Sequence, residues 1–126
     1  MGELRVGIDL VEIAGLAESI ARFGDAFLHK VFTPAELADC AGATARLAAR
    51  FAAKEAAMKV LRPRREDALP WRSIEVCRSG DAAQLVLHDQ ALRLAARDAL
   101  SGLALSITHE RDFAAAVVVA QRGDAP

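Results

Sequence analysis

The sequence predicts an α+β fold, in which antiparallel strands and amphipathic helices form a single small domain. Three features support this class. A strand-like alternation opens the chain, an alanine-rich segment near its middle is typical of a long helix, and two strand-like runs joined by a short polar turn close it. With 126 residues and 53% hydrophobic content, we expect one domain over residues 1–122, followed by a flexible tail at 123–126.

The first predicted strand covers Arg5–Val11 and places a carboxylate opposite an apolar face. Alternation predicts that the residues of the apolar face are buried: Val6, Ile8 and Leu10. Gly7 and Asp9 then share the other face, and a glycine inside a strand often marks the close approach of a ligand or another backbone. Asp9 is either a functional carboxylate or the cap of a helix that begins near Glu12.

Three helices are expected after this strand. The first covers about residues 13–23 and is broken by the glycine that follows. Residues 33–36 read Thr-Pro-Ala-Glu, a capping box with proline at the first helical position, so a short helix begins there and ends near Gly42. A long helix then begins with Thr44 as its cap and is stopped by Pro63.

The second half of the chain predicts two hairpins with a helix between them. The first hairpin covers residues 73–88 around a Gly-Asp turn, and the second covers residues 103–120 around Glu-Arg-Asp. The helix is capped by Asp89 and ends at Gly102. Its inward face is expected to consist of Leu92, Ala95, Ala96 and Ala99.

Four ionisable groups interrupt the alanines of the long helix: Arg50, Lys54, Glu55 and Lys59. The predicted apolar stripe of this helix is narrow and consists of Leu47, Phe51 and Met58. Glu55 lies about 40° from Phe51 by helical rotation, at the edge of the stripe. A carboxylate at the margin of a buried face is half dehydrated, which suits a hard-metal ligand or a proton acceptor. The alternative is a solvated ion pair with Lys59, one turn further along.

Three blocks of the sequence resemble the signature motifs of the holo-[acyl-carrier-protein] synthases, the small bacterial class of 4′-phosphopantetheinyl transferases. The blocks are Gly7–Ile13, Arg50–Glu55 and Leu105–His109, the last followed by Phe113 and an apolar run. They occur in the family's order and span nearly the whole chain. The resemblance implies the family's α+β fold, with an antiparallel sheet on a long helix, assembled as a homotrimer that binds coenzyme A in clefts between subunits.

The resemblance also implies a reaction. The 4′-phosphopantetheine group moves from coenzyme A to a serine of an apo acyl carrier protein, an acidic helical domain, and adenosine 3′,5′-bisphosphate is released. Magnesium, which favours carboxylate and phosphate oxygens, would be held by Asp9 and Glu55. Glu55, or a water molecule that the metal polarises, is the expected base for the serine proton. Lys59 is expected to bond a phosphate oxygen or to stabilise the leaving group.

The resemblance extends to basic residues that would contact coenzyme A. Arg50 lies in the second motif and His109 ends the third, so both are candidate contacts to a coenzyme A phosphate. The alternatives are a structural salt bridge for Arg50 and a half-buried structural role for His109. Arg50, together with Arg46 and Lys54, lies about 100–180° around the helix from the predicted metal ligand. One subunit therefore cannot point all three at one pyrophosphate, so they face a neighbouring subunit's cleft or bind a different coenzyme A phosphate. For Arg46 the alternative is a solvated charge on the helix.

Composition and charge argue against some classes of partner. The net charge of −1 argues against nucleic acid, because phosphate binding requires a basic surface. No apolar run approaches the roughly 20 residues that span a bilayer, and no signal-peptide segment is recognisable, so we expect no membrane partner and a cytoplasmic location. Cys40 and Cys77 lack the spacing of a metal motif and are expected to be reduced thiols.

Two departures from the family motifs leave the acceptor and the activity open. Gly15 stands where many members carry an arginine that docks the acidic carrier protein. The basic segment Arg62–Asp67 replaces a glycine-rich turn near the coenzyme, and it is either a solvated loop or a contact for phosphates or an acidic carrier. The alternative to an active transferase is therefore a non-catalytic module that retains the fold to dock a carrier protein or a synthase.

Overall fold

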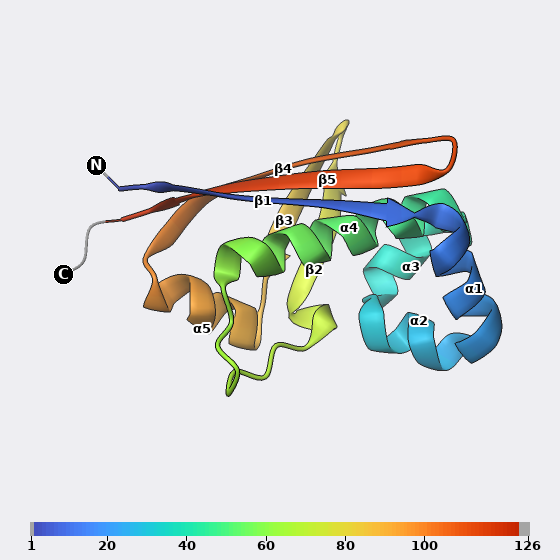
Figure 1. Ribbon diagram of the computed structural model, residues 1–126, viewed down its shortest axis with the longest axis horizontal. Coiled ribbons are helices and arrows are strands. Elements are labelled where there is room, and N and C mark those ends of the chain that lie inside the picture. Colours follow the sequence, from blue (N-terminus) through green and yellow to red (C-terminus); the bar gives the residue numbers. More distant parts are fainter. Residues whose placement is uncertain (1, 124–126) are drawn as a thin grey trace.

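The structure, a computed structural model, describes residues 2–123 and confirms the predicted α+β class (Figure 1). In chain order its elements are β1 (Leu4–Glu12), α1 (Ile13–Phe23), α2 (Asp25–Val31), α3 (Pro34–Cys40), α4 (Thr44–Leu61), the 3₁₀ turn η1 (Trp71–Ser73), β2 (Ile74–Ser79), β3 (Ala82–Leu87), α5 (Asp89–Arg97), β4 (Leu100–Glu110) and β5 (Phe113–Arg122). Strands β1, β5 and β4 form an antiparallel sheet in that order, and β2 and β3 form a separate hairpin.

Helix α4 is at the centre of this arrangement. It runs along one face of the three-stranded sheet, with α1–α3 at one end of the molecule and α5 near the other (Figure 1). Eleven of its 18 residues are buried, including alanines on several sides. The predicted narrow apolar stripe is therefore wrong, because neighbouring elements enclose the helix rather than covering one side of it. Alanine makes this enclosure feasible, since its small side chain lets strands and helices approach closely.

A close approach between the sheet and α4 occurs at Gly7 of β1. A Cβ atom at this position would lie 2.0 Å from the carbonyl oxygen of Ala56, so a larger residue would push the strand away from the helix. The prediction that Gly7 marks a close approach is confirmed, and the approaching group is the backbone of α4. Asp9, two residues further along the same strand face, is thereby brought to the surface of this helix.

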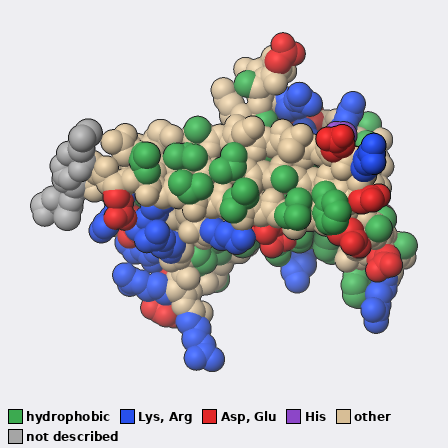
Figure 2. All heavy atoms as spheres, turned by 45° about the horizontal axis from the view of Figure 1, so that its top comes forward, with side chains coloured by type: hydrophobic (Ala, Val, Ile, Leu, Met, Phe, Trp, Pro, Cys, Tyr) green, Lys and Arg blue, Asp and Glu red, His purple; other side chains and the backbone are tan. Residues whose placement is uncertain are grey.

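The opposite face of the three-stranded sheet is apolar and exposed. On β1 its side chains are 62–68% exposed: Leu4, Val6, Ile8 and Leu10. Figure 2 shows hydrophobic side chains spread along this side of the molecule. The prediction that Val6, Ile8 and Leu10 are buried is therefore wrong for the single chain. The buried face is the one that carries Gly7, because that face lies on α4.

The N-terminal helix and the capping box are confirmed, whereas the predicted cap of the long helix is wrong. Helix α1 has the predicted bounds, 13–23. At the start of α3, the Glu36 amide donates to the Thr33 hydroxyl at 3.2 Å, and the Thr33 amide donates to the Glu36 carboxylate at 2.8 Å. Helix α4 begins at Thr44, but its cap is Ala43 and no side chain accepts a hydrogen bond there.

The remaining differences concern helices. Helix α2, which has seven residues and follows Gly24 directly, was not predicted from the sequence. Helix α5 buries Ala91, Leu94 and Ala95 and ends at Arg97. Ala95 is therefore buried as predicted, whereas the rest of the predicted inward face is exposed and the predicted end at Gly102 is wrong. Leu92 is 56% exposed. Asp89 is the first residue of α5 and makes no side-chain cap. The two predicted hairpins are confirmed, with bounds that differ by a few residues.

Gly123, the residue after β5, is hydrogen-bonded to the residue that precedes β4. The amide of Gly123 donates to the carbonyl of Ala99 at 2.8 Å. The rest of the predicted tail, residues 124–126, lies outside the described residues.

Within residues 2–123, no helix combines the length and the apolar composition that a membrane span requires. Cys40 and Cys77 are free thiols, as predicted.

Candidate functional site

Asp9 of β1 lies beside Glu55 and Lys59 of α4, and we call these three residues the carboxylate site. The Lys59 ammonium donates to the carbonyl of Ile8 at 2.6 Å and lies 3.4 Å from the Asp9 carboxylate. The side chain of Asp9 is 15% exposed and that of Lys59 is 55% exposed, so the site is open on one side. The close contact at Gly7 holds β1 against α4, and Asp9 lies two residues further along the same strand face, so it comes next to the helix.

Burial and the negative charge of Asp9 both raise the pKa of Glu55, and the ammonium of Lys59 opposes them. Burial is the largest of these effects, because a half-dehydrated carboxylate loses hydration that favours its charged form. The effect of Asp9 means that the two carboxylates are close enough to repel one another. Asp9 and Glu55 thus lie close enough, on adjoining faces of β1 and α4, to interact electrostatically.

Two neighbouring carboxylates that repel one another fit a divalent cation. Magnesium takes oxygen ligands only, and it is usually held by one or two carboxylates together with water and substrate phosphates. Asp9 and Glu55 supply this donor set. Among residues 2–123, no group of three or more His, Cys, Asp or Glu side chains could hold a metal ion.

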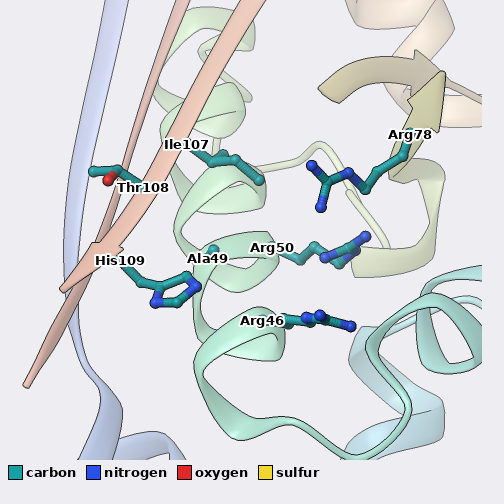
Figure 3. Close-up of a pocket in the computed structure, with 7 residues that line it drawn as sticks. All are labelled: Arg46, Ala49, Arg50, Arg78, Ile107, Thr108 and His109. Atoms are coloured by element: carbon teal, nitrogen blue, oxygen red, sulfur yellow. The ribbon is translucent and has the colours of Figure 1, made fainter. Parts of the chain in front are cut away.

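A second region of α4 carries a concentration of positive charge, which we call the arginine pocket. A cavity of about 350 Å³ is lined by Arg46, Ala49, Arg50, Arg78, Ile107, Thr108 and His109. Figure 3 shows Arg46 and Arg50 extending from α4, Arg78 reaching toward them from β2, and His109 on the neighbouring strand β4. Arg50 and His109, predicted from two separate motifs, thus lie in one cavity. Such a group of nitrogen donors suits an anion, and phosphate in particular.

Arg50 is the buried member of the arginine pocket, with only 2% of its side chain exposed. Its Nη2 atom lies 3.7 Å from the Asp39 carboxylate, which is an ion pair beyond hydrogen-bonding distance. Its Nε atom is buried and has no hydrogen-bond partner among the described residues. A buried donor without a partner is uncommon in a native structure, so the contacts within the chain do not satisfy the whole guanidinium. The predicted alternative of a structural salt bridge accounts for only part of this side chain.

Lys54 was expected to accompany Arg46 and Arg50 toward a ligand, and this prediction is wrong. Its side chain is fully buried, and its ammonium lies 2.8 Å from the Glu36 carboxylate. It also donates to the carbonyl oxygens of Trp71 and Ile74. Burial lowers the pKa of Lys54, and the charge of Glu36 opposes that effect. Lys54 therefore joins α4 to α3, η1 and β2, and helical rotation alone could not reveal that a buried partner stands there.

The structure does not bring all candidate residues into one place. Asp9, Glu55 and Lys59 lie together, Arg50 and His109 lie together, and the cavity of the arginine pocket is lined by none of the first three. This separation agrees with the rotation predicted for the two faces of the long helix. Arg78 was not predicted as a site residue, because a single arginine near the end of a strand carries no motif or periodicity that marks it.

A shallow apolar groove lies beside Glu55. It has a volume of about 320 Å³ and is lined by Leu10, Val11, Glu12, Gly15, Leu16, Ser19, Phe27, Phe51 and Glu55. Gly15 lies on its wall, and a Cβ atom there would meet only the Glu12 carboxylate, at 3.9 Å. The position that departs from the resembled motif therefore opens onto the site rather than being closed by neighbours.

Comparison with known proteins identifies the family. Residues 5–118 match the profile of the 4′-phosphopantetheinyl transferase superfamily. A holo-[acyl-carrier-protein] synthase of Koribacter versatilis is 42% identical over 120 residues, which cover 92% of this chain and 96% of that protein. The structure resembles that of the Helicobacter pylori holo-[acyl-carrier-protein] synthase in complex with coenzyme A, with a TM-score of 0.83 and 30% identity over 93% of this chain and 100% of that one.

The ACPS–CoA complex of Chronobacterium ammoniagenes gives a TM-score of 0.86 and 32% identity over 97% of this chain and 99% of that one. The relatives and the solved structures thus agree with the three motifs on which the predicted resemblance rests. The chain belongs to the 4′-phosphopantetheinyl transferase superfamily, within its family of holo-[acyl-carrier-protein] synthases.

Proposed function

We propose that this protein transfers the 4′-phosphopantetheine group from coenzyme A to a serine hydroxyl of an apo acyl carrier protein, with release of adenosine 3′,5′-bisphosphate. The observation that carries the proposal is the meeting of Asp9 and Glu55 in a chain that belongs to this transferase family. Curated relatives are named for the synthesis of holo-acyl carrier protein, and two solved relatives are complexes with coenzyme A. We also expect it to act in the cytoplasm.

Asp9 and Glu55 are the proposed ligands of magnesium. The bond that breaks lies within the diphosphate of coenzyme A, so negative charge must be stabilised on the leaving phosphate. When bound, magnesium would supply positive charge at the phosphate oxygens and polarise a neighbouring water molecule. Asp9 and Glu55 would fix that charge at the junction of β1 and α4, next to the groove that contains Gly15.

Glu55 is also the proposed acceptor of the serine proton, directly or through a water molecule. In the metal-free chain its pKa is raised by burial and by Asp9, which makes the carboxylate a stronger base than a solvated one. A bound cation would oppose this effect, because its charge stabilises the ionised carboxylate. General base catalysis contributes about 10²–10⁴-fold to a rate. The groove beside Glu55 gives a serine hydroxyl a route to this carboxylate.

Lys59 is the proposed contact to a phosphate oxygen at the same site. An ammonium group has three donors; the carbonyl of Ile8 accepts one of them at 2.6 Å, and the Asp9 carboxylate accepts another at 3.4 Å. The Lys59 side chain is 55% exposed, so a phosphate oxygen can approach its ammonium group. A positive charge at this position would stabilise the leaving adenosine 3′,5′-bisphosphate.

The arginine pocket is the proposed site for a second phosphate of coenzyme A. The coenzyme carries a 3′-phosphate in addition to its diphosphate, and the guanidinium of Arg50, which lines the cavity, would pair with such a group. Arg46, Arg78 and His109 would surround the same phosphate. Arg50 and His109 keep the coenzyme-binding role predicted from the sequence, and Arg78 is added to them.

We propose a homotrimer in which the exposed apolar face of β1 is buried between subunits. Four side chains of this strand that are each more than 60% exposed form an unusually apolar surface for a monomer: Leu4, Val6, Ile8 and Leu10. The coenzyme would then bridge the carboxylate site of one subunit and the arginine pocket of the next. Analytical ultracentrifugation tests the assembly, and a monomer at micromolar concentration would contradict it.

The transfer reaction is tested by incubating the purified protein with coenzyme A, Mg²⁺ and apo acyl carrier proteins, followed by mass spectrometry of the carriers. We expect each carrier to gain one phosphopantetheine group, and we expect no gain with EDTA or with a carrier whose acceptor serine is replaced by alanine. Failure with carriers of both fatty-acid and polyketide systems would contradict the proposal. Binding of a carrier without modification, and no heat of binding with coenzyme A, would favour the docking module instead.

A further inference from the structure

Alanine dominates the surfaces where α4 and the three-stranded sheet meet. The buried residues include Ala52, Ala53, Ala56 and Ala57 of the helix and Ala114, Ala116 and Ala120 of β5. Side-chain ridges and grooves normally define how a helix is seated on its neighbours. Alanine ridges are shallow, so they allow a close approach but resist sliding poorly. A site made from one residue of β1 and two of α4 therefore needs another contact that fixes the strand along the helix axis.

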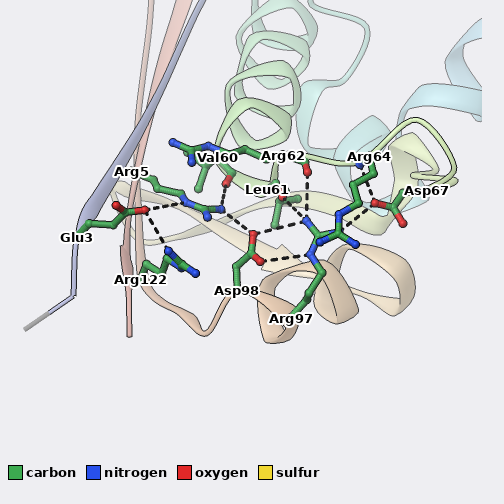
Figure 4. Close-up of polar contacts among 10 residues, drawn as sticks. All are labelled: Glu3, Arg5, Val60, Leu61, Arg62, Arg64, Asp67, Arg97, Asp98 and Arg122. Atoms are coloured by element: carbon green, nitrogen blue, oxygen red, sulfur yellow. Dashed lines mark hydrogen bonds and ion pairs between the residues drawn. The ribbon is translucent and has the colours of Figure 1, made fainter. Parts of the chain in front are cut away.

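Arg5 supplies such a contact from the same strand face as Gly7 and Asp9. Its side chain is 5% exposed, and its Nη1 atom donates to the carbonyl of Val60 at 3.0 Å and to the Asp98 carboxylate at 2.9 Å (Figure 4). Arg5 thus meets the last turn of α4, whereas Gly7 meets Ala56 one turn earlier. The two contacts hold β1 at two heights along the helix.

Asp98 and Arg97, at the end of α5, hold the side chain of Arg5 in place through hydrogen bonds. The Asp98 carboxylate accepts a hydrogen bond from Arg5 and another from the Nε atom of Arg97, at 3.3 Å. Arg97 also donates to the carbonyls of Leu61 and Arg62, at 3.4 and 3.1 Å. The carbonyls at the end of α4 thus accept hydrogen bonds from two guanidinium groups (Figure 4). The strand, the end of the helix and α5 form one hydrogen-bonded unit.

Stability alone is a poor explanation for a buried arginine at this position. The Nε atom of Arg5 is buried and has no hydrogen-bond partner among residues 2–123, and the nearby Glu3 carboxylate is 3.7 Å away. Replacing a buried ion pair with apolar residues is often neutral or stabilising, whereas buried polar groups are best known for fixing the register of packed elements. Arg5 has the contacts that such a role requires.

We propose that Arg5 is a positioning residue of the carboxylate site, which sets the axial register of β1 on α4 so that Asp9 lies beside Glu55 and Lys59. This inference rests on the proposed function, because Asp9 and Glu55 are the proposed ligands of the cation. The short side chain of Asp9 cannot compensate for a slide of the strand by part of a helical turn. Arg5 would therefore act on the cation site without touching it.

Binding of Mn²⁺ to the purified protein, without coenzyme, tests this inference by calorimetry or electron paramagnetic resonance. The wild-type chain should bind Mn²⁺, and the single substitution Asp9→Asn should abolish this binding, which would identify the site. Arg5→Met keeps the aliphatic stem, leaves Asp98 paired with Arg97 and should weaken Mn²⁺ affinity about 10–100-fold, as loss of outer-shell support typically does. The direction of the change in affinity distinguishes positioning from charge, because removal of the positive charge of Arg5 by itself would strengthen cation binding.

Two control variants separate alignment from charge and from stability. Arg93→Met removes an exposed guanidinium of α5 that bonds to Gln90, and Val76→Ala opens a cavity in the core beneath the β2–β3 hairpin. Both should keep the wild-type Mn²⁺ affinity, although Val76→Ala lowers the Tm. In turnover assays, Arg5→Met should raise the Mg²⁺ concentration required for half-maximal rate and leave the KM for coenzyme A unchanged.

Wild-type or tighter Mn²⁺ binding by a folded Arg5→Met variant would overturn the inference. If Arg5→Met does not fold, Asp98→Asn replaces it as the test. This change weakens the hydrogen bonds that residue 98 accepts from Arg5 and Arg97, but it keeps the hydrogen bond from Arg5 to the carbonyl of Val60. Asp98→Asn should weaken Mn²⁺ affinity about tenfold, and unchanged affinity would overturn the inference equally. A wild-type chain that binds no Mn²⁺, or binds it as well as Asp9→Asn does, would overturn the proposed metal site and the role of Arg5 with it.

Discussion

The carboxylate site and the arginine pocket are built on one helix, yet they differ in charge, exposure and the strand that completes them. The first joins the later half of α4 to β1 and presents oxygen atoms at a half-open edge. The second joins the earlier half of α4 to β2 and β4 and presents nitrogen donors around a buried Arg50. A substrate with phosphates at two separate places can engage both. One helix can thus keep the proposed chemistry and the proposed coenzyme binding apart, so variants of the two regions should show different defects.

The largest effect is expected from the carboxylate site. Asp9→Ala and Glu55→Ala should each lower turnover by about 10²–10⁴-fold, because each removes a proposed metal ligand and Glu55→Ala also removes the proposed base. Mass spectrometry of the carrier measures the rate, and circular dichroism shows whether the fold is retained. Asp81→Ala, in the turn of the β2–β3 hairpin, is the matched control and should transfer at the wild-type rate. Undiminished turnover in either site variant would break the metal assignment.

Two lysines of α4 separate a buried structural charge from a proposed functional charge. Lys54→Met should lower the free energy of unfolding by about 3–5 kcal/mol, because it leaves the buried Glu36 carboxylate without its partner. Lys59→Met should change that free energy by less than about 1 kcal/mol, since the Lys59 side chain is 55% exposed and its contact with Asp9 is long at 3.4 Å, while turnover falls. Urea denaturation measures both changes. Equal stability losses in the two variants would contradict the structural role of Lys54.

In the arginine pocket we expect effects on coenzyme binding. Arg50→Met and Arg78→Met should each raise the KM for coenzyme A about 10–100-fold, since charge-assisted hydrogen bonds contribute about 1.5–3 kcal/mol. The maximal rate should change much less than in the carboxylate-site variants. Dephospho-coenzyme A, which lacks the 3′-phosphate, provides the control in steady-state kinetics. If Arg50→Met weakened the use of both coenzymes equally, the pocket would not be the site of that phosphate.

The pH dependence of stability gives a smaller effect that reports on the carboxylate site alone. Burial and Asp9 raise the pKa of Glu55, so the folded state binds its proton more tightly than the unfolded state does. The contribution of Glu55 is therefore fully present below its unfolded pKa and is lost as the pH rises through the folded pKa. In EDTA, Glu55→Gln should have a higher Tm than the wild type at pH 7, and this advantage should disappear near pH 4. An advantage that is the same at both pH values would contradict the raised pKa.

The smallest expected effect concerns Gly15, on the groove beside Glu55. Gly15→Arg should lower the KM for an acidic carrier protein by up to about fivefold, as a surface ion pair of about 0.2–1 kcal/mol would do. The position has room for a side chain, because a Cβ atom there meets only Glu12, at 3.9 Å. The gain should diminish at high salt. Gly15→Gln is the uncharged control, and an equal gain with glutamine would show that charge is not responsible.

The sequence predicted the local structure best where residues next to one another in the chain decide it. The capping box at Thr33, the break at Gly24 and the two hairpin turns are of this kind, because caps and turns depend on adjacent side chains. Helix α2 was missed, since its seven residues are too few for a clear helical period. The close approach at Gly7 was predicted correctly because only glycine leaves space for another backbone.

The candidate site was predictable as two groups of residues but not as a whole. Helical rotation separated Glu55 from Arg50, and the structure places them in different regions. Rotation could not show that Lys54 faces a buried Glu36, or that Arg78 reaches the pocket from a distant hairpin. Alternation in β1 separated the apolar from the polar face, yet it could not show that α4 covers the face of Gly7 and leaves Val6 exposed. Each of these facts depends on partners remote in the chain.

The most direct test of the account is a crystal structure with coenzyme A and Mn²⁺, in which anomalous scattering locates the cation. The account predicts one Mn²⁺ ion bonded to carboxylate oxygens of both Asp9 and Glu55 and to a diphosphate oxygen of the coenzyme. An ion held by the phosphates without either side chain, or at a place away from the junction of β1 and α4, would contradict it.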